Sequence, residues 1–145
     1  MTLEVWDGVG PVLADTSAWM QARRDERVRQ LLLGAIERGD VCWCWPVRYE
    51  LMVDARSQGD IAAVERSLEV LREIPVDRSV QRTIYSAMRQ MAASGSHGPH
   101  RFPLTDLAVA AAAQAAGIEI LHFDRHFERL SAHFGVTAYW ISPPA

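Results

Sequence analysis

Four carboxylates in this chain each stand where a strand ends or a helix begins. They are Asp15, Glu50, Asp106 and Asp124. Asp15 directly follows the short apolar run at 12–14, and Asp124 directly follows the apolar run "IEILHF". Ligands of an open parallel sheet bind beyond the carboxyl ends of its strands. We therefore expect Asp15 and Asp124 to lie at the same edge.

The other two acids are expected to reach that edge from helices. Glu50 lies in the first turns after Pro46, and Asp106 lies in the first turn after a loop. Carboxylates packed so closely cannot all ionise unless cations lie among them. Hard oxygen ligands select Mg²⁺ or Mn²⁺, and a pair of such ions is a standard arrangement for phosphodiester hydrolysis.

Each acid taken alone also has a purely structural interpretation. Asp15 is a suitable helix N-cap, Glu50 a solvated acid and Asp124 a turn former. Asp106 favours the start of its helix through the helix dipole, with Thr105 as the expected N-cap. The residues alone therefore predict a metal-binding α/β domain and leave its reaction open.

The elements that position these acids alternate along the chain. Expected strands cover 12–14, 40–45, 73–77, 117–124 and 136–141. Expected helices cover the segment after 15–17 as far as Gly39, and then 46–59, 61–73, 78–94, 104–116 and 125–135, with a loop at 95–103. Strands that alternate with helices predict a mostly parallel sheet.

Composition limits the function classes. The 145 residues suffice for one domain, and 49% hydrophobic with 23% charged residues is ordinary for a soluble globular protein. The net charge of −3 gives no basic signature of nucleic-acid binding. All fifteen cationic side chains are arginine, which excludes P-loop and Schiff-base chemistry because both need lysine.

The chain shows no membrane or export signal. No apolar run approaches the length of a transmembrane helix, and the first residues lack the pattern of a signal peptide. We therefore expect a cytoplasmic protein. Cys42 and Cys44 fit neither a redox nor a zinc motif, so we expect both to be buried and reduced.

Other conspicuous residues have two interpretations each. Trp43 and Trp45 could stack on bases, but a strand covered on both faces predicts that they belong to the core. The cluster Arg23, Arg24, Arg27 and Arg29 could contact phosphates, but a solvated helix face paired with Asp25 and Glu26 is the expectation for Arg29.

A zinc site is the remaining alternative from the residues. His122, Asp124 and His126 stand at alternate positions and would share one face of a continuing strand. We expect the strand to end near Asp124, which disfavours this triad. His122 is then expected to pack in the core or to support a metal ligand.

The chain resembles the PIN-domain ribonucleases, and among them the VapC toxins of type II toxin–antitoxin pairs. The motifs "LADTSAW", "PVRYEL", "HRFPLTDLAVAAAAQAAGIEILHFDRHFE" and "VTAYW" span nearly the whole chain in that family's order. The resemblance implies one PIN domain over 1–145, with a Rossmann-like three-layer α/β/α fold and a mostly parallel sheet of about four or five strands.

The resemblance also implies a function. Asp15, Glu50, Asp106 and Asp124 would be the catalytic, metal-binding set, with Thr16 and Ser17 in support, for Mg²⁺- or Mn²⁺-dependent endonucleolytic cleavage of RNA. It implies a homodimer and a small antitoxin that often blocks the acidic site with a C-terminal segment carrying a basic residue. Arg101, beside Asp106, is a candidate contact for RNA or antitoxin.

One departure and two alternatives accompany the resemblance. Many relatives place a further aspartate where this chain has His126, so a second metal position is in question. The alternatives are a non-catalytic PIN-like binding module, and a metal-dependent nuclease or phosphatase outside any toxin–antitoxin pair.

Overall fold

The computed structural model describes residues 4–94 and 101–144. The strands are β1 (Val12–Ala14), β2 (Val41–Trp43), β3 (Arg72–Glu73), β4 (Glu119–His122) and β5 (Ala138–Trp140). The helices are α1 (Thr16–Arg24), α2 (Glu26–Glu37), α3 (Trp45–Val53), α4 (Gln58–Glu69), α5 (Arg78–Ala93), α6 (Leu104–Ala116) and α7 (His126–Phe134).

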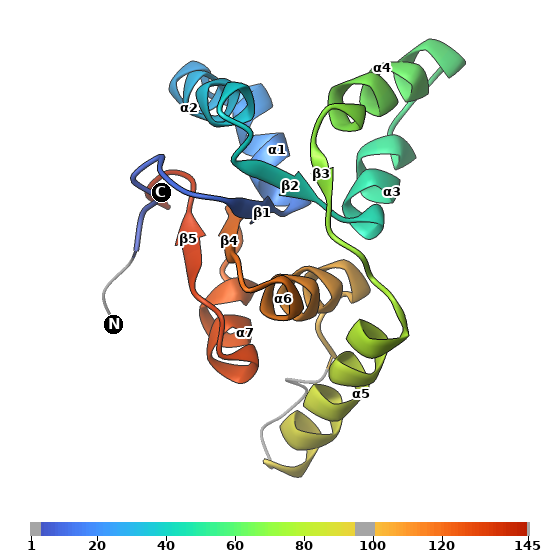
Figure 1. Ribbon diagram of the computed structural model, residues 1–145, viewed down its shortest axis with the longest axis vertical. Coiled ribbons are helices and arrows are strands. Elements are labelled where there is room, and N and C mark those ends of the chain that lie inside the picture. Colours follow the sequence, from blue (N-terminus) through green and yellow to red (C-terminus); the bar gives the residue numbers. More distant parts are fainter. Residues whose placement is uncertain (1–3, 95–100, 145) are drawn as a thin grey trace.

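The five strands form one sheet in the order β3-β2-β1-β4-β5, and every pair is parallel. Helices α1 and α2 pack on one side of the sheet. Helices α6 and α7 pack on the other side, with α5 outside α6 (Figure 1). The predicted three-layer α/β/α fold with a parallel sheet is confirmed.

The central strand β1 fixes the place of the acidic edge. Leu13 pairs with Cys42 of β2 on one side and with Ile120 of β4 on the other. Its side chains are fully buried because helices cover both faces. Asp15 leaves this strand at its carboxyl end, and its backbone N–H donates to the Leu121 carbonyl at 2.9 Å.

Aspartate and serine caps set most helix starts. Asp25 breaks the expected long helix in two, because its carboxylate accepts hydrogen bonds from the Arg27 and Val28 amides and so opens α2. The expectation of one helix up to Gly39 was therefore wrong. Ser57 similarly opens α4 by accepting from the Asp60 amide, so α3 ends at Val53 and does not reach Gly59.

Three further expectations need correction. The strand expected at 73–77 is shorter than predicted. β3 covers only Arg72 and Glu73, begins one residue earlier, and is exposed at the edge of the sheet. Thr105 is not the N-cap of α6: Pro103 stands there without a side-chain cap, and Thr105 is already inside the helix. Trp45 is not in the core. It opens α3 and is 50% exposed, whereas Trp43 is buried as expected.

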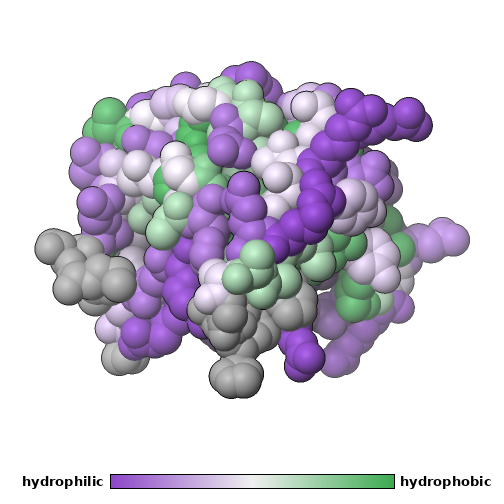
Figure 2. Space-filling model, turned by 90° about the horizontal axis from the view of Figure 1, so that it is seen from below, coloured by the Kyte–Doolittle hydropathy of each residue, from purple (hydrophilic) through white to green (hydrophobic). Residues whose placement is uncertain are grey.

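Figure 2 shows the face seen from below as mainly hydrophilic, with hydrophobic side chains in small separate patches. No helix in the described part of the chain is long and apolar enough to cross a membrane.

The alanine-rich helix α6 is the tightest-packed element. Its residues from Thr105 to Ala113 are all buried, because α3, α5, α7, β1 and β4 surround it. Small side chains let these neighbours approach closely at little cost in side-chain entropy. The position of Asp106, in the first turn of α6, therefore depends on close packing along the helix.

Replacing Ala111 by leucine tests this packing. Ala111 is fully buried, so the added volume should lower the free energy of unfolding by roughly 1–3 kcal/mol, measured by urea denaturation. The control Ala115→Leu, at an exposed position of the same helix, should change it by less than about 0.5 kcal/mol. Equal effects of the two substitutions would contradict the close packing of α6.

Candidate functional site

Asp15 is the most deeply buried acid of the predicted set, with 3% of its surface exposed. Its Oδ2 accepts hydrogen bonds from the Ser17 amide at 3.0 Å and from the Ser17 hydroxyl at 2.6 Å. Its Oδ1 is buried and has no hydrogen-bond partner among the residues that the structure describes. Asp15 thus caps α1, as its structural interpretation predicted, and one of its oxygens is left over.

Thr16 and Ser17 connect the acids to the sheet. The Thr16 hydroxyl donates to Glu50 Oε1 at 2.6 Å, which joins α1 to α3. The Ser17 hydroxyl donates to Asp15 and accepts from the Phe123 amide at 2.9 Å, which joins α1 to the segment after β4. Both side chains therefore hold the acids in place.

Asp106 lies at the opposite side of the site, in the first turn of α6, and is 7% exposed. Its Oδ2 is 2.7 Å from Nδ1 of His126, the first residue of α7. Asp124 is more exposed, and its Oδ1 accepts from the His126 amide at 2.9 Å. Ligand atoms of Asp106, Asp124 and His126 all lie within 4.8 Å of one another.

The carboxylates act on one another electrostatically. Burial, against the hydrogen bonds from Ser17 and with smaller contributions from the charges of Asp106 and Glu50, raises the pKa of Asp15 to about 7. Burial also raises the pKa of Asp106, with a smaller contribution from Asp124 and Glu50, while His126 lowers it. Asp106 and Glu50 thus lie near enough to act on Asp15, and Asp124 and Glu50 near enough to act on Asp106.

This environment fits a divalent cation. A buried carboxylate oxygen without a donor, surrounded by other carboxylates, is electrostatically unfavourable unless positive charge is supplied. Oxygen ligands are those that Mg²⁺ and Mn²⁺ prefer. We therefore propose Asp15, Glu50, Asp106 and Asp124 as the residues that hold such an ion.

The zinc triad considered from the sequence does not form. β4 ends at His122, which is 1% exposed and packs between Phe127 and Trp140, with ring centroids 5.0 and 4.9 Å away. Its Nδ1 accepts from the Asp124 amide, and burial lowers its pKa to about 4. His122 is thus a neutral, packed residue, as expected.

Other predicted residues have varied outcomes. Arg29 pairs with Glu26 on the solvated face of α2, as expected. Cys42 and Cys44 are buried and free, also as expected. Arg101 is exposed just before α6, and its side chain makes no hydrogen bond or ion pair within the described part of the chain.

Sequence reasoning missed the contact of His126 with Asp106. The change from strand β4 to helix α7 could have indicated this contact. His126 is the first residue of α7, and the first residues of helices at this edge lie close to one another. Phe102, just before α6, packs edge-on against the His126 ring with centroids 5.4 Å apart.

Comparison with known proteins identifies the family. The PIN domain model matches residues 12–132. The chain belongs to the PIN-domain family. Ribonuclease VapC18 of Mycobacterium tuberculosis is 34% identical over 131 residues, which cover 89% of this chain and 93% of that protein. Ribonuclease VapC6 of the same organism is 33% identical over 106 residues, which cover 72% and 81%. The resemblance to VapC proteins is thereby confirmed.

Solved structures share the PIN fold. The DNA-bound VapBC of Salmonella typhimurium matches with a TM-score of 0.70 at 16% identity, over 92% of this chain and 100% of that one. FitAB bound to the IR36 DNA fragment matches with a TM-score of 0.62 at 21% identity, over 90% and 94%.

The burial of Asp15 predicts a pH-dependent stability in this PIN domain. Burial raises the pKa of Asp15 from its ordinary 3.8 to about 7 in the folded protein, so the folded state keeps the proton to a higher pH than the unfolded state does. Asp15 therefore contributes stability that is present at low pH and lost as the pH rises through 7. In Asp15→Asn, an amide can accept from Ser17 and donate toward the other acids, so this loss should disappear.

Thermal unfolding of EDTA-treated protein measures the effect. The unfolding free energy of Asp15→Asn relative to wild type should rise by about 1.4 kcal/mol per pH unit at most between pH 4 and 7. The comparison with wild type is needed because the low pKa of His122 acts in the opposite direction over part of this range. The exposed Glu69→Gln variant is the control, and a pH-independent difference for Asp15→Asn would contradict the interpretation.

Proposed function

We propose that this protein is a metal-dependent endoribonuclease and the toxin of a type II toxin–antitoxin pair. The observation that carries the proposal is the buried Asp15 carboxylate at the carboxyl edge of a PIN-domain sheet. Among the described residues one of its oxygens has no hydrogen-bond partner, and the charges of Asp106 and Glu50 act on it. The relatives named Ribonuclease VapC support RNA as the substrate. We infer one PIN domain over 1–145, acting in the cytoplasm.

The residues of the site have two roles, metal binding and the positioning of the metal ligands. Asp15, Glu50, Asp106 and Asp124 would hold Mg²⁺ or Mn²⁺, which when bound supplies Lewis acidity and an activated water for phosphodiester hydrolysis. Ser17 connects Asp15 to the segment after β4, and Thr16 connects Glu50 of α3 to the start of α1. In the reaction, water adds to phosphorus, one P–O bond to ribose breaks, and the leaving oxygen takes up a proton.

The fixed geometry matters for rate. Ligands that are already in place need little reorganisation in the reaction, because their positions are set during folding. Asp15 and Ser17 lie at the rigid start of α1, directly after the central strand. The protein can therefore hold a phosphodiester and a nucleophile in one orientation.

Cleavage of RNA is the direct test. Purified protein, free of antitoxin, should cleave single-stranded or structured RNA with Mg²⁺ or Mn²⁺ and lose this activity with EDTA. Asp106→Asn keeps the size of the side chain but removes its charge, so the cleavage rate should fall by at least about 100-fold. Gel analysis of end-labelled RNA measures the rate.

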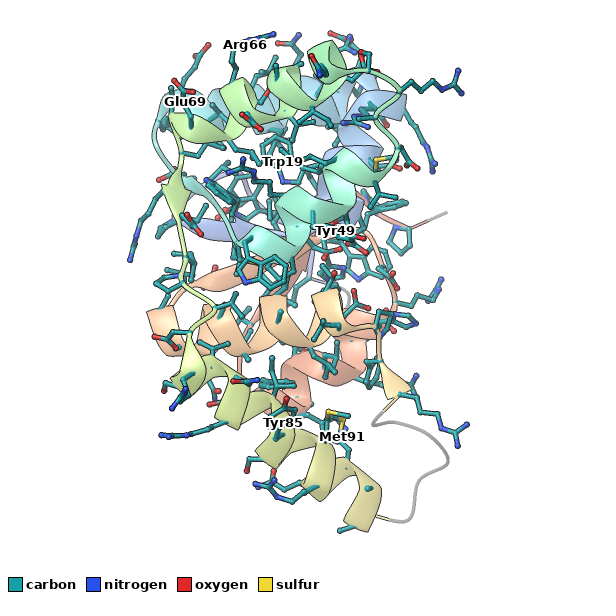
Figure 3. The ribbon with its side chains drawn as sticks, turned by 90° about the vertical axis from the view of Figure 1, so that its right-hand side faces the viewer. Trp19, Tyr49, Arg66, Glu69, Tyr85 and Met91 are labelled. Carbon is teal, nitrogen blue, oxygen red and sulfur yellow. The ribbon has the colours of Figure 1, made fainter. Side chains whose placement is uncertain are left out.

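The control is Glu69→Gln, which removes an exposed acid on α4 far from the sheet edge and should leave the rate unchanged (Figure 3). Cleavage in EDTA, or full activity in Asp106→Asn, would overturn the mechanism. DNA of the same sequence, tested in parallel, separates a ribonuclease from a general nuclease. Absence of cleavage with metal bound would favour the non-catalytic binding module.

We infer that the antitoxin binds a groove between α1–α2 and α3–α4. The groove has a volume of about 560 Å³, and its walls include Trp19, Leu32, Leu33, Ile36, Leu51 and Leu68. Figure 3 shows Trp19 lying between these helices. Leu33 is 44% exposed there, which suits an amphipathic segment of a small partner. Solved relatives titled VapBC complexes support such a partner.

We infer that a second copy of the chain covers another face. Trp45, Tyr49, Tyr85 and Leu104 are all at least half exposed, and they come from α3, α5 and α6. Figure 3 shows Tyr49 and Tyr85 on the same side of the molecule. Large aromatic side chains grouped on one surface are typical of protein interfaces. This face supports the homodimer implied by the resemblance.

Two substitutions separate these interfaces, and each is the other's control. Leu33→Glu places a charge in the groove and should abolish co-purification with the protein encoded by the adjacent short reading frame, while the dimer remains. Tyr85→Glu should convert the dimer to a monomer by light scattering and leave antitoxin binding intact. If both variants keep both assemblies, neither surface has the role assigned to it.

A further inference from the structure

His126 occupies a position where it can act on a metal directly. Its Nδ1 is 2.7 Å from Asp106 Oδ2 and 3.6 Å from Asp124 Oδ1. These three residues are the group whose ligand atoms all fall within 4.8 Å of one another. Two ligands of one six-coordinate ion, each at about 2.1 Å from it, lie about 3 Å apart. Nδ1 therefore lies at the spacing of a ligand beside both carboxylates.

The orientation of the imidazole ring is fixed by its neighbours. The ring packs edge-on against Phe102. The backbone N–H of His126 donates a hydrogen bond to Asp124 Oδ1 at 2.9 Å. His126 is also the first residue of α7, so the helix sets the direction of its side chain. The ring thus points into the acidic site from a fixed element, and 41% of its side chain surface stays open to solvent.

An independent observation supports a cation among these residues. Asp15 Oδ1 is buried and has no hydrogen-bond partner among the described residues, and its carboxylate interacts with the charges of Asp106 and Glu50. Asp15 Oδ1 therefore has no positively charged partner among the described residues, and His126 does not supply one. Hydrogen bonding by His126 satisfies Asp106 alone and leaves this oxygen without a partner.

We propose that His126 is a nitrogen ligand of the metal site, beside Asp106 and Asp124, and that this ligand makes the site select Mn²⁺ over Mg²⁺. The inference rests on the metal-binding part of the proposed function and goes beyond it, because it assigns a ligand and a metal preference. Imidazole nitrogen suits transition metals, whereas Mg²⁺ is bound almost entirely through oxygen. A carboxylate at this position would give an all-oxygen site.

Metal binding without RNA tests the proposal. Mn²⁺ and Mg²⁺ are titrated separately into metal-free protein, and pulsed EPR of the Mn²⁺ form records the nitrogen modulation of a coordinated imidazole. Wild type should show this modulation. In His126→Asp the modulation should disappear, and the ratio of Mn²⁺ to Mg²⁺ affinity should fall by about tenfold or more. His126→Gln should also lose the modulation.

His133→Gln is the matched control, because His133 is an exposed histidine on the same helix. It should keep both the modulation and the metal preference. If wild type binds Mn²⁺ without nitrogen modulation, or if the modulation survives in His126→Asp, His126 only orients Asp106 and the proposal fails.

The proposed function has a separate outcome. RNA cleavage with no nitrogen modulation rejects His126 as a ligand and leaves the ribonuclease in place. Nitrogen modulation without RNA cleavage keeps the ligand assignment and rejects the ribonuclease. Protein that binds neither ion rejects both.

Discussion

The burial of the Asp15 carboxylate is the constraint on which the site depends. An ionised carboxylate removed from water is strongly destabilised unless donors or cations compensate. Here Ser17 supplies donors to one oxygen, and the other has none among the described residues. The chain thus keeps a costly group at the end of its central strand. Such a cost is typical of a site shaped by function and not by stability.

The parallel sheet brings the remaining acids to Asp15. β1 and β4 are parallel neighbours, and Ala14 pairs with Leu121. Asp15, directly after β1, and Asp124, two residues after β4, therefore leave the sheet at the same edge. Asp106 arrives from α6, whose alanines allow it to lie against both strands. Glu50 arrives from α3, which begins directly after β2. Four segments distant in sequence meet because strands of one direction share a carboxyl edge.

The hydrophobic pattern of the sequence predicted the strands and the edge that the acids share. It did not predict features in which a side chain competes with the backbone for hydrogen bonds, or in which two helices pack together. Apolar runs gave the strands, and the position of acids after them gave the shared edge. The break at Asp25 was not predicted because the helical pattern of apolar residues continues across it. The Asp25 carboxylate accepts hydrogen bonds from the following amides, and this ends α1 and begins α2. Trp45 was misplaced because it opens α3 and does not continue β2. His126 contacts Asp106 only through tertiary packing of α7 on α6.

Helix α1 links the acidic site to the groove. Its first turn holds Asp15 and Ser17, while Trp19, Ala22 and Arg23 further along line the groove. Eight residues separate Asp15 from Arg23, which corresponds to about 12 Å along a helix. An extended segment of about four residues spans that distance. A small partner bound in the groove, as we propose for the antitoxin, is therefore within reach of the carboxylates.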